Sequence, residues 1–159
     1  IMGALVLIQL VAFVATMVYI RLANYIGLKN GIFLGIIGYC IILFAGYFVK
    51  SITHFYIVAL LIGCFQGGIQ SISRSLYSRI IPENKAAEFY GFYNMLGKFA
   101  AVFGPVLMGS VKLLLSNIVD DEIRAARFGL LSIIILFILG GYVFSKVDIE
   151  EGESIAKNL

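Results

Sequence analysis

Five long apolar runs separated by short polar segments are the dominant pattern along this chain. The hydrocarbon core of a bilayer is ~30 Å thick, and a helix needs ~20 residues to cross it. The runs have about that length, so they predict membrane-spanning helices at about 2–20, 32–49, 55–76, 89–115 and 124–145. The predicted fold class is all-α, a polytopic transmembrane helix bundle of about five helices over residues 1–147.

The segments between the runs carry signals for turns and helix ends. The connector at 21–31 contains two glycines and two asparagines. Pro82 disfavours a continuous helix from the third run into the fourth, and Pro105 predicts a bend in the long fourth run. The acidic residues 120–122 suit the positive end of the last helix dipole. The short polar tail, 148–159, is expected to form no more than a helical turn.

The composition supports an integral membrane protein. The chain is 61% hydrophobic and 13% charged, with a mean hydropathy of +1.00, whereas soluble domains have ~45–50% apolar and ~25% charged residues. The apolar run at Ile1 follows no basic leader or cleavage site, so we expect a truncated N-terminus rather than a signal peptide. Cys40 and Cys64 lie in apolar runs without further cysteines or histidines nearby, which suggests neither a disulfide nor a metal site.

The distribution of positive charge predicts the orientation in the membrane. Seven basic residues fall on one side of the predicted bundle and four on the other. The richer side, with Arg21, Lys29, Arg74, Arg79, Lys85, Lys146 and Lys157, is assigned to the cytoplasm, and the poorer side has Lys50, Lys112, Arg124 and Arg127. The C-terminus is therefore predicted to be cytoplasmic. Because these residues lie in short loops rather than in one patch, nucleic-acid binding is not indicated.

A polar stripe interrupts the third predicted span. Gln66, Gln70 and Arg74 recur every four residues, and each step turns only ~40° around a helix. Gly67 and Gly68 beside them permit close approach of a neighbouring helix or a solute. The glutamines either face a solute pathway or hydrogen-bond to other helices as packing contacts. Arg74 either extends to the interface or forms a gating pair with Glu88 across the loop.

A second stripe follows in the fourth span, where Tyr90, Asn94 and Lys98 have the same spacing and Gly97 adjoins them. Lys98 lies ~15 Å along the helix from Glu88, too far to reach the interface easily. A central lysine costs on the order of 2.5–3.5 kcal/mol to insert, so it normally faces a cavity or a partner. Lys98 is thus either a pathway residue or the structural partner of a carboxylate elsewhere in the protein.

The predicted spans lack the residues that proton coupling or nucleotide binding would require. None has an interior Asp or Glu, and His54 falls in a turn, so any proton-coupling group is expected outside this chain. There is no Gly-Lys-Ser/Thr loop for a nucleotide phosphate. We therefore predict neither an enzyme nor a cofactor or metal site.

Several sequence segments carry a family resemblance. QGGIQSISRS at 66–75, Arg79 with Pro82, and EFYGFYNMLGKFAAVFGP at 88–105 resemble the C-terminal half of the vacuole-effluxer-like family of the major facilitator superfamily, which includes a fungal autophagy-linked amino-acid effluxer and bacterial homologues. More weakly, IRLANYIGLK at 20–29 is similar to a cytoplasmic loop signature of that superfamily. It matches at Leu22, Ala23, Gly27 and Lys29 and departs at Ile20, Asn24, Tyr25 and Leu28.

The resemblance implies that the five spans are helices eight to twelve of a twelve-helix secondary transporter. Such a carrier moves a small polar solute, with amino acids among the candidates, by alternating access between two halves in a bilayer. Its partners would be the lipid, the solute and the N-terminal half of the same protein. The location would be the cell membrane in a prokaryote and the vacuolar membrane in a fungus. The alternatives are a non-transporting membrane sensor or assembly subunit, and a multidrug exporter.

The candidate site residues fall into three groups. The substrate-pathway residues are Gln66, Gln70, Asn94 and Lys98. The gate and cytoplasmic-loop residues are Arg74, Arg79, Glu88, Arg21 and Lys29. The packing and bending residues are Gly67, Gly68, Gly97, Gly104 and Pro105.

Overall fold

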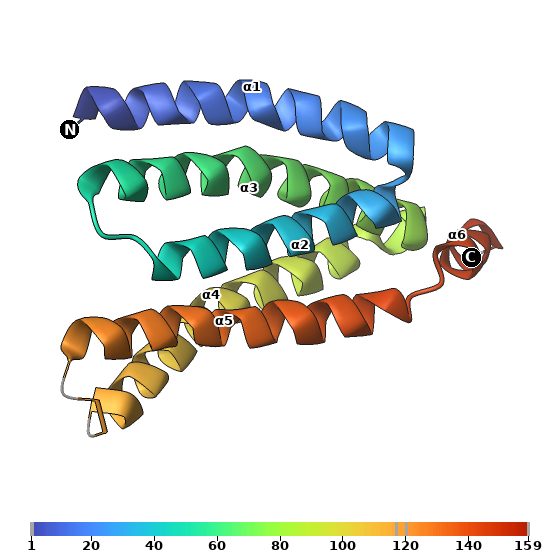
Figure 1. The fold of residues 1–159 in the computed structure, drawn as a ribbon. Coiled ribbons are helices and arrows are strands. Elements are labelled where there is room, and N and C mark those ends of the chain that lie inside the picture. Colours follow the sequence, from blue (N-terminus) through green and yellow to red (C-terminus); the bar gives the residue numbers. More distant parts are fainter. Residues whose placement is uncertain (1, 117, 120, 159) are drawn as a thin grey trace. The chain divides into compact units, whose positions relative to one another are not determined.

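The structure, a computed structural model, describes residues 2–116, 118–119 and 121–158. Within these residues the elements are α1 (Met2–Ile26), α2 (Leu28–Tyr47), α3 (Ile52–Ile80), the short 3₁₀ helix η1 (Glu83–Lys85), α4 (Ala86–Ser116), α5 (Glu122–Ser145) and α6 (Ile149–Asn158) (Figure 1). The helices α1 to α5 are long and apolar enough to cross a membrane. The predicted all-α fold with five spans is confirmed.

The first connector is much shorter than predicted. Helix α1 continues to Ile26 and α2 begins at Leu28, so only Gly27 interrupts the helical backbone. Gly27 has φ +94°, a left-handed conformation that glycine adopts without a Cβ clash. The prediction of a long turn at 21–31 was wrong because polar residues end the apolar run without ending the helix. A helix can continue into the interface while its backbone hydrogen bonds remain satisfied.

The described chain divides into two compact units, residues 1–76 and 77–159. In the first unit α2 packs on α3 through glycines. A Cβ added at Gly38 would lie 2.5 Å from Phe65 Cε1, and one at Gly31 would lie 3.2 Å from Ile72 Cδ1. Ile72 retains only 2% of its accessible surface at this contact. Because lipid gives helices no hydrophobic reason to associate, such close backbone approach supplies the packing.

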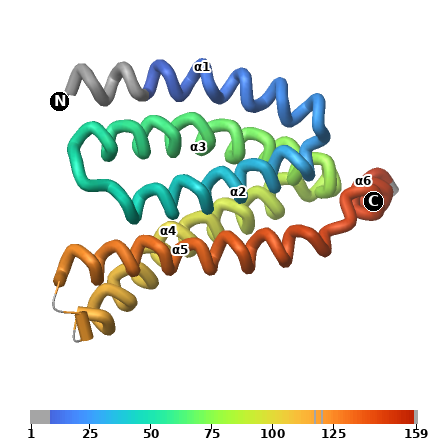
Figure 2. Tube along the Cα trace, in the orientation of Figure 1, coloured from blue at the N-terminus to red at the C-terminus, as the bar shows by residue number. Residues whose placement is uncertain are grey.

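In the second unit α4 and α5 pack against each other (Figure 2). The backbone of Gly129 on α5 lies against the Met108 carbonyl of α4, and the buried Ser132 hydroxyl donates to the Gly129 carbonyl at 2.6 Å. Helix α4 continues through Pro105 without interruption, so the bend there stays a prediction. Helix α3 ends two residues before Pro82, which precedes η1, as the sequence predicts.

Asp121 forms the N-cap of α5. Its Oδ1 accepts from the backbone N–H groups of Ile123, at 2.9 Å, and Arg124, at 3.4 Å. These bonds satisfy donors that have no partner within the helix. The neighbouring Asp120, also expected at this helix start, lies outside the described residues.

The expectation for the polar tail was wrong, because Ile149–Asn158 forms the helix α6. Asp148 accepts a hydrogen bond from the Glu151 N–H at 3.1 Å, which caps the first turn. Glu150 and Glu151 lie at the positive end of the helix dipole and Lys157 at the negative end. The polar composition of the tail suggested disorder, but its charges lie at the helix ends where they interact favourably with the helix dipole.

Candidate functional site

A polar groove lies between α1 and α3 in the first unit. Its volume is about 590 Å³, and its hydrogen-bonding side chains are Gln9, Thr16, Gln66 and Gln70. Apolar and small residues complete the lining, at Ala12, Phe13, Ala59, Ile62, Gly63 and Gly67. The first stripe predicted from the sequence is therefore part of a groove with a second wall from α1. A volume of this size lies within the range of small-molecule sites, ~300–1,000 Å³.

Small residues bring the two walls of this groove together. A Cβ added at Gly67 would overlap the Thr16 hydroxyl, and one at Gly68 would overlap the Tyr19 ring. The Tyr19 hydroxyl in turn donates to the Gly31 carbonyl of α2 at 2.7 Å in a buried position. The two glycines thus set the separation of α1 and α3, and with it the width of the groove.

The groove amides are available to a ligand. Within the described residues, the side chains of Gln66 and Gln70 are exposed and make no hydrogen bond to another residue. The Thr16 hydroxyl donates to the Ala12 carbonyl at 2.8 Å and keeps its acceptor lone pairs. A groove with these groups offers both donors and acceptors, and it contains no charged side chain.

Sequence reasoning missed the α1 wall. Neither Gln9 nor Thr16 was among the site residues predicted from the sequence. A signal was present, because Gln9 and Thr16 are seven residues apart and therefore share one helix face. Only the packing of α1 on α3 shows that this face meets Gln66 and Gln70.

The second predicted stripe lies on α4, in the second unit. Asn94 and Lys98 are exposed, and Lys98 forms no ion pair with any described carboxylate. A Cβ at Gly97 or Gly104 would have nothing within 4 Å. The packing roles predicted for these two glycines, and a joint site of both stripes, stay predictions.

Tyr90, the first member of that stripe, belongs to a cluster of three tyrosines. Its ring lies 5.6 Å from that of Tyr77, and Tyr77 lies 4.9 Å from Tyr93. The Tyr77 hydroxyl donates to the Phe89 carbonyl at 3.0 Å. This cluster connects the end of α3 with the beginning of α4, so Tyr90 has a structural contact rather than an open polar face.

The predicted gate residues are distributed over helix ends. Arg21 is exposed near the end of α1, and Lys29 is half-buried in the first turn of α2. Arg74 is exposed on α3 and Glu88 in the first turn of α4. They belong to different units, so their pairing stays a prediction. Arg79 has a different partner, since its Nη1 lies 4.0 Å from Glu153 Oε1 of α6.

These features define a class of protein. Five apolar helices of membrane-crossing length, with a groove between two of them lined by amides that have no partner in the described part of the chain, belong to a multi-pass integral membrane protein. Among the described residues, no group of three His, Cys, Asp or Glu side chains is arranged to hold a metal ion. The groove offers hydrogen bonding, which suits reversible binding.

The comparison with known proteins agrees with that class. The family model described as "Vacuole effluxer Atg22 like" matches residues 1–157, and the chain belongs to this family. The chain is 33% identical over 149 residues to the uncharacterized MFS-type transporter YxiO of Bacillus subtilis, which covers 94% of this chain and 33% of that protein. It is 28% identical over 127 residues to autophagy-related protein 22 of Vanderwaltozyma polyspora, covering 80% of this chain and 22% of that protein.

The Saccharomyces cerevisiae autophagy-related protein 22 is similar over the same length, at 25% identity. The chain thus spans about a third or less of the length of these relatives. No solved structure matches the chain significantly.

Proposed function

We propose that the full-length protein is a secondary transporter of the major facilitator type, which moves a small polar solute by alternating access. Amino acids are among the candidate solutes. The present chain supplies the C-terminal half of the helix bundle, corresponding to helices eight to twelve. Membership of the vacuole-effluxer-like family and the MFS-type transporter name of the bacterial relative support this proposal.

The polar groove between α1 and α3 is the observation that carries the proposal. Three amides and a hydroxyl in membrane-spanning helices would be costly if they faced lipid. Gln66 and Gln70 make no hydrogen bond to another helix among the described residues, which leaves their amides for a solute or for helices of the full-length protein outside this chain. A polar solute can form hydrogen bonds with these amides, whereas lipid tails cannot.

Asn94 and Lys98 on α4 are also assigned to the solute pathway of the full-length protein. A lysine within a membrane helix normally faces a cavity or a partner. In the transporter it would bind an anionic group of the solute or pair with a carboxylate of the N-terminal half. Arg21, Lys29, Arg74, Arg79 and Glu88 are assigned to the cytoplasmic gate region. The cytoplasmic position of that region follows from the excess of basic residues there.

Solute flux in proteoliposomes tests the proposal. Full-length protein would be reconstituted and screened with radiolabelled neutral, acidic and basic amino acids, and with ethidium as a probe of multidrug export. We expect amino-acid flux, and we expect Lys98→Ala and Gln66→Leu to reduce it by about tenfold or more with normal membrane insertion. Lys112→Ala is the matched control, because Lys112 is also an exposed lysine of α4 but lies about four helical turns beyond Lys98, near the end of the helix.

The alternatives predict different results. In a non-transporting sensor or assembly subunit, Lys98→Ala would lower abundance and leave the flux per molecule unchanged. Ethidium flux without amino-acid flux would identify a multidrug exporter. Either result would contradict the proposed function.

A further inference from the structure

One face of α6 lies against the rest of the second unit. The half-buried positions of this helix are Ile149, Gly152, Glu153 and Ala156. They follow the spacing i, i+3, i+4 and i+7, which places them on one side of a helix. The intervening positions 150, 151, 154, 155 and 157 are exposed. Helix α6 therefore docks through a defined face.

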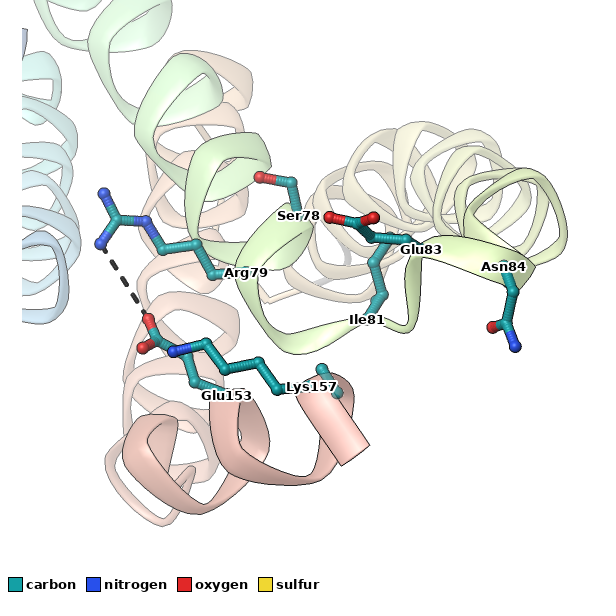
Figure 3. A pocket seen from close by; sticks show the side chains of 8 residues that line it. Ser78, Arg79, Ile81, Glu83, Asn84, Glu153 and Lys157 are labelled. Atoms are coloured by element: carbon teal, nitrogen blue, oxygen red, sulfur yellow. Dashed lines mark ion pairs between the residues drawn. The ribbon is translucent and has the colours of Figure 1, made fainter. Parts of the chain in front are cut away.

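The docking contacts are made to the last turn of α3. A Cβ added at Gly152 would lie 3.1 Å from Ile80 Cγ2 and 3.3 Å from Ile80 Cβ, so the two helices touch at this glycine. Next to this contact, Arg79 Nη1 lies 4.0 Å from Glu153 Oε1 (Figure 3). The docking site thus combines one close apolar contact with one ion pair.

The contact is incomplete, and this makes it weak. A hollow of about 640 Å³ remains beside it, lined by Ser78, Arg79, Ile81, Glu83 and Asn84, and by Glu153, Ala156 and Lys157 of α6 (Figure 3). The side chains of Arg79 and Glu153 are 56% and 32% exposed, and exposed pairs contribute little to stability. A helix of 10 residues is also too short to be stable alone. Helix α6 is therefore held loosely, and its helical state depends on docking.

The docking site is the junction between α3 and α4. Residues 81–85 connect the two helices that carry the predicted polar stripes, and the Tyr77, Tyr90 and Tyr93 cluster links their ends. A change in tilt between α3 and α4 at this junction would therefore move Arg79 and Ile80 beneath α6. The position of α6 is coupled to any such change.

We propose that α6 is a strap, docked on the α3–α4 junction in the state seen here, that must leave its docking site for the transport cycle to proceed. This inference rests on the proposed transport function. Weak docking suits the role, because a small change in free energy then exchanges the docked and released states. The strap would regulate the rate of the cycle without contacting the solute.

A reversible disulfide tests the strap. Cys40 and Cys64, both free thiols, would first be replaced by alanine. Ile80→Cys and Gly152→Cys would then be introduced, since their Cβ separation of 3.3 Å is close to the ~3.5–4.5 Å of disulfides. Oxidation is expected to cross-link the full-length protein and to lower solute flux by about tenfold or more, and reduction is expected to restore it.

The pair Ile80→Cys with Ser154→Cys is the matched control, because Ser154 lies on the exposed side of α6 and should not cross-link. Absence of a cross-link in the Ile80–Gly152 pair would overturn the docking. Complete cross-linking with unchanged flux would overturn the need for release. If the full-length protein with Cys40 and Cys64 replaced by alanine moves no solute, the proposed transport function is contradicted. The strap's role in transport then fails with it. The cross-linking yield still measures the docking of α6 in that case.

Loosening the strap gives a second readout. Glu153→Gln removes the ion pair with Arg79, whereas Glu150→Gln changes a carboxylate on the exposed side. We expect Glu153→Gln to raise maximal flux about two- to fivefold at unchanged KM, because release becomes easier while the solute site is unaltered. Equal effects of the two substitutions, or a change in KM alone, would count against the strap.

Discussion

Some glycines of this chain lie against a neighbouring helix, and others have open space around them. Gly67 and Gly68 on α3 face side chains of α1 so closely that a Cβ would overlap Thr16 and Tyr19. Gly97 on α4 has nothing within 4 Å of an added Cβ. The sequence singled out these glycines on the same grounds, as small residues beside a polar stripe. The difference depends on which helix lies opposite, and that is a property of packing rather than of local sequence.

This difference predicts the effect of a larger side chain. Gly68→Leu should destabilise the protein by ~1–3 kcal/mol or more, because the Tyr19 ring occupies the space that the side chain needs. The measurement is the thermal unfolding temperature of the full-length protein in detergent. Gly140→Leu on α5, where an added Cβ also has nothing within 4 Å, is the control and should unfold close to the parent temperature. If both substitutions lowered Tm equally, the packing of α1 on α3 would be in doubt.

At the scale of helices, the apolar runs predicted the existence of the five spans but not their ends. Helix α3 covers 29 residues and α4 covers 31, longer than a bilayer requires. The boundary between α1 and α2 is set by the positive φ of Gly27, and the starts of α5 and α6 by side-chain hydrogen bonds of Asp121 and Asp148. Residues of these types also occur in turns and disordered segments, so their presence alone did not predict where a helix begins.

The N-cap of α5 is a testable case. Asp121→Ala removes an acceptor for the N–H groups of Ile123 and Arg124 and should cost about 1 kcal/mol of stability. Asp121→Asn retains a side-chain oxygen in the same place and should recover most of that loss. Denaturant unfolding of the two variants measures the difference. Equal losses would show that the charge of Asp121, rather than its hydrogen bonds, stabilises the start of α5.

For the whole molecule, charge distribution predicts the orientation of the five spans. The α3–α4 connection carries Lys85, with Arg79 beside it in the last turn of α3, and is predicted to be cytoplasmic. The α2–α3 connection at residues 48–51 is predicted to face the opposite side. The alternation follows because each apolar helix crosses the membrane once.

Thiol labelling in intact bacterial cells checks this orientation. In a background with Cys40 and Cys64 replaced by alanine, a membrane-impermeant maleimide should label Ser51→Cys directly. It should label Asn84→Cys only after the cells are permeabilised. The reverse pattern would invert the predicted topology and move the docking site of α6 to the other face of the membrane.

The amino-acid sequence by itself determined the class, the five spans and the two polar stripes. These depend on the length of apolar runs and on helical periodicity, which are local properties. The family resemblance was also readable in short blocks, and the match to the vacuole-effluxer-like family confirms it.

Tertiary structure alone decided which surfaces meet. Gln9 and Thr16 join Gln66 and Gln70 because glycines let α1 approach α3, and the two walls are about fifty residues apart in the chain. Helix α6 is stabilised by docking, because Gly152 on one of its faces contacts Ile80 and Glu153 on the same face pairs with Arg79. Contacts between segments that are distant in the chain depend on the shapes of both segments. A short stretch of sequence contains only one of them and so does not predict the contact.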